Sequence, residues 1–333
     1  MYGSTANIKR IISSRCAPIG GHSERFVSIV AIFPQLASLI LKEHKYQAID
    51  GDLLLIGRQS VMLTRDQAGQ LIEAEGIAIH PDAFEEIDEG TVGSRGDGYL
   101  TDRSFFSLFC GARVRAIDVS NYEGAEIVHD LNCPVGPEHH GIADVIFDGS
   151  CLDNLFDPAT ALKSISTMLR PHGRAICFEH GTPIQSAMLC FSPEWFFDFF
   201  ACNDYDDCQV FVCSFGQSMQ NPWVVRHWRP FFEDRGTLER SPISFGYDYV
   251  TVVVAQKGES STNDRTPIQG HYRQMHDGGR DAYVDRHVRY QASGRSYQFV
   301  RAYEPIAPDA ERLARDAERI RKAARVIGML EPT

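Results

Sequence analysis

The most regular feature of the chain is a set of short apolar segments, most of which end in a polar or acidic residue. The first, at 48–57, is a turn followed by a continuous run of Leu and Ile that ends at Gly57. Such a run is typical of a strand buried on both faces of a parallel sheet. Similar segments follow at 113–120, 126–130, 144–148 and 174–179. They predict strands whose polar residues lie at the carboxyl ends.

Helical periodicity separates these segments. It predicts helices over 23–44, 64–75, 158–169 and 193–201, and a further helix capped by Asp102 that ends at Phe109. The pattern thus alternates between periods of about 2 and about 3.6 residues, which predicts crossover connections and a doubly wound, mostly parallel sheet. Two later strands, at 208–214 and 247–256, are expected to form an antiparallel edge pair.

The sequence divides into three parts. Residues 1–47 comprise a loosely ordered lead-in and the first helix. Residues 48–257 form the α/β domain, with an insertion at about 60–100 that is rich in Gly and acids. Residues 258–333 are a polar extension that ends in a helix at 308–327. The arginines of that helix either bind an anionic partner or, with the interspersed acids, form a solvated face.

Composition narrows the possible partners. A formal net charge of -11 disfavours nucleic acid as a substrate. Nine cysteines without a CxxC pair indicate reduced thiols in a cytoplasmic protein, with no disulfide and no metal site. The apolar run at 26–41 contains Pro34 and is shorter than a membrane span, so a buried or partner-facing helix is expected. Homo-oligomerisation is left open.

Residues 144–179 resemble the fourth strand, helix and fifth strand of class I S-adenosylmethionine-dependent methyltransferases. That family ends the helix with a motif close to LkPGG, and residues 169–173 read LRPHG here. Residues 116–132, AIDVSNYEGAEIVHDLN, resemble its second and third strands. The resemblance covers about 53–256. It implies a seven-stranded, Rossmann-like sheet with an antiparallel C-terminal pair, and S-adenosyl-L-methionine as cofactor.

The resemblance also assigns residues to the cofactor. It places Asp118 at the ribose hydroxyls, Asp130 at the adenine, and the turn after the fourth strand at the sulfonium. The alternatives are local, because Asp118 could cap its own turn and Asp130 could belong to an ordinary strand-end turn. The expected cofactor contacts are Gly57, Arg58, Asp118, Val119, Asp130, Leu131, Asp148, Gly149 and Ser150.

One departure from the family concerns the glycine-rich loop after the first strand, which is reduced to Gly57-Arg58-Gln59-Ser60. Side chains at these positions are expected to crowd the methionine moiety. GRQ at 57–59, SNYEGA at 120–125 and SPEWFFDFF at 192–200 resemble a subgroup of methyltransferase-like proteins. That subgroup is tied to glycan or secondary-metabolite biosynthesis.

Candidate catalytic residues end the fifth strand. His180, next to Glu179, could take the proton of a hydroxyl nucleophile, because the pKa of histidine lies near neutrality. Other chemistry-bearing residues have equally good structural explanations. Asp153 and Asn154 face substrate or begin a helix, His139 and His140 bind metal or lie in a solvated loop, and the aromatic residues at 191–200 line a substrate pocket or pack in the core.

These observations predict methyl transfer from S-adenosyl-L-methionine to an oxygen or nitrogen of a small molecule or glycan. The sulfonium is already activated, so no fixed catalytic triad is expected. The alternative is a catalytically silent methyltransferase-like binding or scaffold module, which the reduced glycine loop favours. A nicotinamide-dependent oxidoreductase would need a GxGxxG after the first strand, and the sequence has none there.

Overall fold

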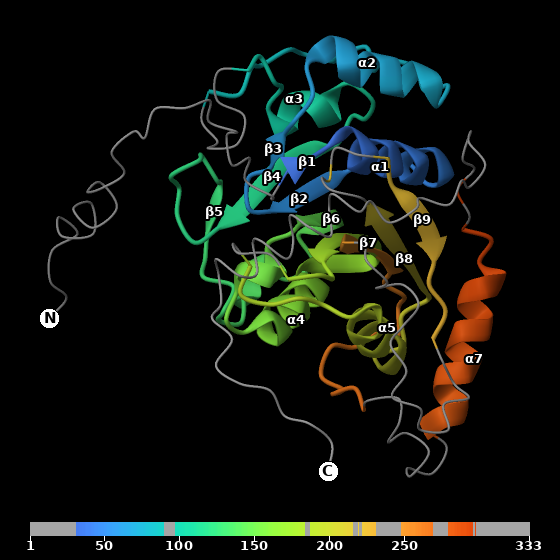
Figure 1. The fold of residues 1–333 in the computed structure, drawn as a ribbon. Coiled ribbons are helices and arrows are strands. Elements are labelled where there is room, and N and C mark those ends of the chain that lie inside the picture. Colours follow the sequence, from blue (N-terminus) through green and yellow to red (C-terminus); the bar gives the residue numbers. More distant parts are fainter. Residues whose placement is uncertain are drawn as a thin grey trace, which may run out of the picture.

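The computed structural model describes residues 31–89, 97–183, 187–215, 219, 222–230, 248–268, 279–295 and 297. These residues form a mixed α/β fold around a large sheet with helices on both faces (Figure 1). The lead-in, the start of the first expected helix and the helix expected at 308–327 lie outside the described residues.

The large sheet has eight strands in the order β5-β4-β2-β6-β7-β10-β8-β9. The first five in chain order, β2 to β7, pair in parallel, and β10 runs antiparallel to both β7 and β8. The strands are β2 (Asp52–Ile56), β4 (Arg113–Asp118), β5 (Ile127–Val128), β6 (Ala143–Gly149), β7 (Leu169–His180), β8 (Asp207–Phe215), β9 (Val224–His227) and β10 (Asp248–Gln256).

The sheet confirms the expected alternation and the antiparallel pairing of β8 with β10, but this pair does not form the edge, because β9 lies beyond β8. Seven strands were expected, and β9 is the additional one. It lies between the two strands expected at 208–214 and 247–256 and pairs with β8, with Phe211 opposite His227. Only four residues long, β9 gains its hydrogen bonds from the edge of β8 and carries little periodicity of its own.

The first helix begins later than expected. Ala31–Ile32 forms a short strand, β1, that pairs in parallel with β3 (Ser60–Val61). The helix α1 then runs from Pro34 to Tyr46. Proline is favoured at the first helical position, and the residue before it is driven toward extended backbone, so Pro34 sets the boundary.

Of the other helices, all but α7 lie close to their expected ranges. They are α2 (Arg65–Ala74), α3 (Asp102–Ser107), α4 (Pro158–Met168), α5 (Pro193–Cys202) and α7 (Gly279–Ala292). The helix α7 falls in the C-terminal extension, at a place where none was expected. The cap of α3 also differs from expectation, because the Thr101 side chain, not that of Asp102, accepts the hydrogen bond from the amide of Ser104.

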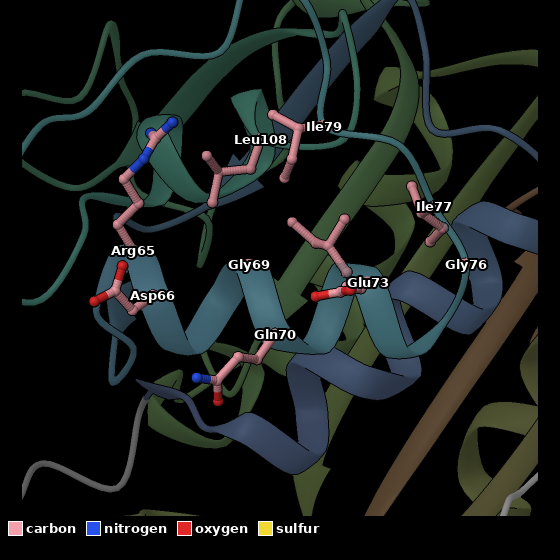
Figure 2. A pocket seen from close by; sticks show the side chains of 10 residues that line it. Arg65, Asp66, Gly69, Gln70, Glu73, Gly76, Ile77, Ile79 and Leu108 are labelled. Atoms are coloured by element: carbon pink, nitrogen blue, oxygen red, sulfur yellow. The ribbon is translucent and has the colours of Figure 1, made fainter.

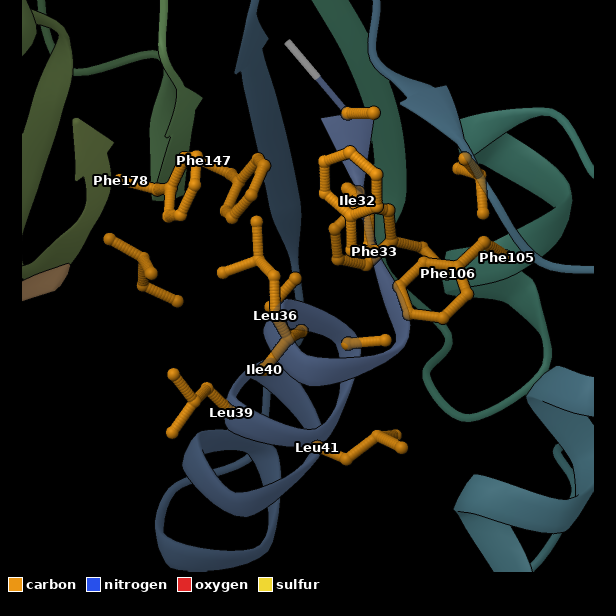
Figure 3. Packing of buried hydrophobic residues seen from close by; sticks show 14 of the residues in the cluster. Ile32, Phe33, Leu36, Leu39, Ile40, Leu41, Phe105, Phe106, Phe147 and Phe178 are labelled. Carbon is orange, nitrogen blue, oxygen red and sulfur yellow. The ribbon is translucent and has the colours of Figure 1, made fainter. Parts of the chain in front are cut away.

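Two apolar cores lie on opposite faces of the sheet. In Figure 3, Leu36 and Ile40 of α1 point toward Phe147 and Phe178 of the sheet, and Phe106 of α3 closes the same cluster. The other face is covered by α4 and α5 (Figure 1). The aromatic side chains of α5 lie in this second core, including Phe196, Phe197, Phe199 and Phe200. They therefore pack as core residues.

A buried group of charged side chains joins distant parts of the chain. Glu43 of α1 is ion-paired with Arg174 of β7 at 2.9 Å and with Arg295, which follows α7. Arg295 also pairs with Asp207 at the start of β8, at 3.0 Å. Both guanidinium side chains are only 3% exposed. The carboxylates therefore offset the free-energy cost of burying their positive charges.

The start of α2 provides a first prediction. Thr64 accepts a hydrogen bond from the amide of Gln67, and the Gln67 side chain accepts one from the amide of Thr64, which together form a capping box. We expect Thr64→Ala to lower the free energy of unfolding by about 1 kcal/mol. Urea denaturation measures this loss. Thr64→Ser, which keeps the hydroxyl, should retain most of the stability, and an equal loss in both variants would contradict the role of the cap.

Candidate functional site

The carboxyl ends of the central strands lie side by side. Ile56 at the end of β2 is paired with Ile117 of β4 on one side and with Asp148 of β6 on the other. The chain runs outward from β2 to β4 and β5, then returns to the other side of β2 as β6. Ligands of open α/β sheets bind in the crevice at such a reversal of strand order. We call the space between the ends of β2 and β6 the crevice.

Asp118 ends β4 beside this crevice and is half-buried. Its Oδ1 accepts the amide of Ser120 at 3.2 Å, which is the expected turn cap. Its Oδ2 lies over Gly57, where an added Cβ would be 3.6 Å away. Gly57 has a φ of 71°, a conformation that favours glycine. The structure thus brings together two of the expected cofactor residues.

Exposed apolar side chains surround the ends of β4 and β5. Val119 is 66% exposed, Tyr122 73% and Phe156 88%. The backbone amide of Phe156 donates to Asn132 Oδ1 at 3.0 Å, which joins the turn after β5 to the segment before α4. Apolar surface beside a carboxylate suits a ligand that combines a flat ring with hydroxyl groups.

Asp130, the residue expected at the adenine, is engaged in its own turn. Its Oδ1 accepts both the amide and the side-chain nitrogen of Asn132, at 3.0 and 2.8 Å. These hydrogen bonds lower the pKa of Asp130. The neighbouring Leu131 is buried in the core beneath the turn.

The first loop is clamped to α3. Arg58 forms a buried ion pair with Asp102 at 2.6 Å, and the other oxygen of Asp102 accepts the amide of Gln59 at 2.9 Å. Burial raises the pKa of Asp102, and the Arg58 charge opposes this shift. Arg58 was expected at the cofactor, and the structure instead directs it to Asp102. The sequence shows Asp102 only as a helix-start residue, so this contact has no sequence signal.

Gln59 fills the crevice above Gly149. Its Nε2 donates to the carbonyls of Ile56 and Gly57, at 3.0 and 3.3 Å, and its Oε1 points toward Gly149. A Cβ added at Gly149 would overlap Oε1 and lie 2.8 Å from Cδ of Gln59. Gly149 was expected to admit the sulfonium end of the cofactor. In the structure, the room that this glycine leaves is taken by the Gln59 amide.

Buried carboxyl groups hold the turn after β6. Asp148 accepts the amide of Cys151 at 3.0 Å, and Glu179 of β7 accepts the amides of Leu152 and Asp153 at 3.0 and 3.1 Å. Burial raises the pKa of both Asp148 and Glu179. The charge of Asp148 raises the pKa of Glu179 further, whereas the hydrogen bond between the two carboxyl groups lowers the pKa of Asp148. A hydrogen bond between two carboxyl groups needs a proton, so the two groups share one near neutral pH. The amides that Glu179 accepts from Leu152 and Asp153 give it a positioning role.

Ser150 and Asp153 extend this group. Ser150 has a positive φ of 71° and donates its hydroxyl to Asp153 Oδ2 at 2.6 Å. Burial raises the pKa of Asp153 to about 6. Asn154 donates to the carbonyl of Ser150 and to Asp153 Oδ1, which makes it part of the same turn.

His180 lies beside this turn and is 1% exposed. Its Nε2 is 3.9 Å from Asp153 Oδ2 and has no hydrogen-bond partner among the described residues. Burial lowers the pKa of His180 to about 4. The imidazole is therefore neutral near pH 7 and is a weaker base than an exposed histidine, so the near-neutral pKa expected from the sequence is not found.

A separate groove of about 680 Å³ lies along α2. Figure 2 shows Arg65, Asp66 and Gln70 of α2 at this groove, with Ile79 and Leu108 on its far side. None of the strand-end residues described above lines it. The sequence singled out no residue of this groove, because α2 reads as an ordinary amphipathic helix.

The other expectations concern metal and membrane. His139 lies in a short 3-10 helix, with its ring centroid 6.3 Å from that of His129. No three His, Cys, Asp or Glu side chains within the described ranges are grouped so as to hold a metal ion. In the same part of the chain, no helix combines the length and the apolar character needed to cross a bilayer.

No protein-family model matches the sequence, and no curated protein matches it. Among solved structures, the chain is similar to the 1,6-didemethyltoxoflavin-N1-methyltransferase of Burkholderia thailandensis, with 16% identity, 68% of this chain and 78% of that chain covered, and a TM-score of 0.31. A SAM-dependent methyltransferase from Archaeoglobus fulgidus matches with 10% identity, 67% and 94% coverage, and a TM-score of 0.36.

A possible histamine N-methyltransferase from Thermotoga maritima is similar at 13% identity, with 67% and 91% coverage and a TM-score of 0.32. The B. thailandensis structure contains S-adenosylhomocysteine. At TM-scores this low, the function of this chain has to be inferred from its own residues.

Proposed function

We propose that this chain transfers a methyl group from S-adenosyl-L-methionine to an oxygen or nitrogen of a small molecule or glycan. The observation that carries the proposal is the Asp118 carboxylate over Gly57, at the reversal of strand order, with apolar side chains exposed at the same edge. A carboxylate can accept both hydroxyls of a ribose, and apolar side chains can cover an adenine.

The nucleoside half of the cofactor fits these residues better than the amino-acid half does. Asp118 with Gly57 and Val119 is the proposed ribose end, and Asp130 with Leu131 the proposed adenine end. Asp148, Gly149 and Ser150 form the turn nearest the expected methyl group, but Gln59 fills the space above Gly149. Arg58 contributes by fixing the first loop through Asp102.

The chemistry that the cofactor supplies is a methyl group already activated by the sulfonium. The chain has to orient the acceptor and take up its proton. His180 is the proposed proton acceptor, because its imidazole is neutral at pH 7 and its Nε2 has no hydrogen-bond partner within the described part of the chain; its lowered pKa makes it a weak base. Glu179 and Asp148 hold the turn that lies beside it. Eight cysteines within the described residues are not in disulfides, and a cytoplasmic location is part of the proposal.

A second candidate function is a catalytically silent module that binds a nucleoside or a partner. The specific observation in its favour is the Gln59 amide in the crevice. The two candidates differ in whether complete S-adenosyl-L-methionine binds and its methyl group is transferred.

Calorimetric titration with S-adenosyl-L-methionine and S-adenosylhomocysteine tests the proposal. We expect saturable binding by the wild type and a loss of about 10- to 100-fold in affinity in Asp118→Ala, because two hydrogen bonds to a charged acceptor disappear. Asp82→Ala, at an exposed carboxylate away from the strand ends, is the matched control and should bind as the wild type does. Failure of both ligands to bind the wild type would favour the silent module.

A further inference from the structure

The side chain at position 59 bears directly on which ligands the crevice accepts, and the inference rests on the proposed function. We propose that Gln59 is a specificity-determining plug. Its amide occupies the part of the crevice where the amino-acid half of S-adenosyl-L-methionine would lie. The chain therefore favours adenosine-type ligands without an amino-acid tail over the complete cofactor.

The orientation of the plug is fixed by its hydrogen bonds. Nε2 of Gln59 lies between two backbone carbonyls, those of Ile56 and Gly57, and only an N–H can donate to them. The amide oxygen must then face the opposite way, toward Gly149. The backbone of Gln59 is held as well, because its own amide donates to Asp102.

Gln59 and Gly149 are complementary in volume. Gln59 is 1% exposed, so its side chain fills the space that it enters. A Cβ at position 149 would overlap the Gln59 amide, so the glycine is needed for Gln59 to occupy this place. In a loop with glycine at position 59, the same space would be open to a ligand at the ends of β2 and β6.

In the crevice, the side-chain amide of Gln59 uses only part of its hydrogen-bonding capacity. Oε1 of Gln59 is buried and has no hydrogen-bond partner among the described residues. A buried carbonyl without a donor is unfavourable, which reduces the net gain from the two bonds at Nε2. The side chain can thus be displaced, at a cost in affinity for any ligand that needs the space.

The two halves of the cofactor are expected to respond differently. A nucleoside needs Asp118 and the apolar side chains near it, whereas the hydrogen bonds that hold Gln59 go to Ile56, Gly57 and Asp102. A ligand with an amino-acid tail binds only when the amide has moved out, so its apparent affinity is reduced by the fraction of molecules in that state.

The test compares S-adenosylhomocysteine with 5′-methylthioadenosine, which has the nucleoside and sulfur but no amino-acid tail, by calorimetric titration. Gln59→Gly recreates a Gly-x-Gly spacing with Gly57. We expect it to bind S-adenosylhomocysteine about tenfold more tightly than the wild type does, since two neutral hydrogen bonds no longer have to be broken. Its affinity for methylthioadenosine should be unchanged.

Two further variants complete the design. Gln59→Leu keeps the volume and removes the amide, so it should show no comparable gain for S-adenosylhomocysteine. Gln59→Ala opens the space with less backbone freedom than glycine and replaces Gln59→Gly if that variant does not fold. In each variant, the ratio of the two affinities is the readout, which corrects for general loss of folded protein.

An unchanged or reduced affinity of the opened variants for S-adenosylhomocysteine, relative to methylthioadenosine, would overturn the plug. A selective loss would show that Gln59 binds the amino-acid half instead. If methylthioadenosine binding persists and is lost in Asp118→Ala, the proposed nucleoside site stands whatever Gln59 does. If neither ligand binds to the wild type or to any variant, both the plug and the proposed function are overturned.

Discussion

We expect Glu43→Gln to lower the free energy of unfolding by about 3–5 kcal/mol. Glu43 is 1% exposed and is the shared partner of Arg174 and Arg295, whose side chains are also buried. Replacing its carboxylate with a neutral amide leaves two guanidinium charges away from water without the charge that compensates them. Asp207 balances only Arg295, and the other bonds of Arg174 are to the backbone carbonyls of Gln47 and Ala48.

Equilibrium denaturation in urea measures this effect. The matched control is Glu85→Gln, which removes the carboxylate of the exposed Arg65–Glu85 pair, 3.7 Å apart. That loss should stay below about 1 kcal/mol, because water screens exposed ion pairs. Equal losses in the two variants would show that burial of the Glu43 group does not determine its contribution.

Asp148→Asn should raise the free energy of unfolding by about 2–4 kcal/mol at about pH 8. Burial raises the pKa of Asp148 from 3.8 to about 7, with Glu179 and Asp153 close by. The folded state therefore retains a proton that the unfolded chain has already lost. The contribution of Asp148 to stability is complete below about pH 4 and is lost as the pH rises through 7. Asparagine keeps an oxygen that accepts the Cys151 amide. Because it does not ionise, the decrease in the free energy of unfolding between pH 4 and pH 8 is removed.

The pH series provides the control for this prediction. The stabilisation of Asp148→Asn over the wild type should vanish near pH 4 and grow toward pH 8, while the opposite titration of His180 is common to both proteins. Asp157→Asn is the matched variant, since Asp157 is exposed and its pKa is lowered by Thr160. It should show no gain at high pH. A gain of Asp148→Asn that is independent of pH would contradict the shared proton.

The strands and helices were predictable where the signal is local. The apolar runs ending at Ile56 and Asp148 are buried on both faces, so their composition alone marks them as central strands. The short strands β1, β3 and β9 were missed, because strands of two to four residues carry little periodicity and are defined by their partners. The start of α1 was placed too early for the same reason, since the pairing of Ala31–Ile32 precedes it.

The candidate site was predictable in part. Residues that follow parallel strands meet at one edge, so the sequence could place Gly57, Asp118 and Gly149 at the same end of the sheet. It could not distinguish the roles of Glu179 and His180, which are adjacent in the chain. Side chains of consecutive strand residues point to opposite faces. Burial raises the pKa of Glu179, and Nε2 of His180 has no hydrogen-bond partner among the residues that the structure describes.

The sequence by itself determined the alternation of strands and helices and the polar character of the strand ends, because periodicity and strand-end chemistry are properties of neighbouring residues. Only the tertiary structure decided what fills the crevice and which charges are compensated. Gln59 lies against Gly149 of another strand end, and Glu43 pairs with Arg295, which is 252 positions away in the chain. Both contacts exist only once the sheet has assembled.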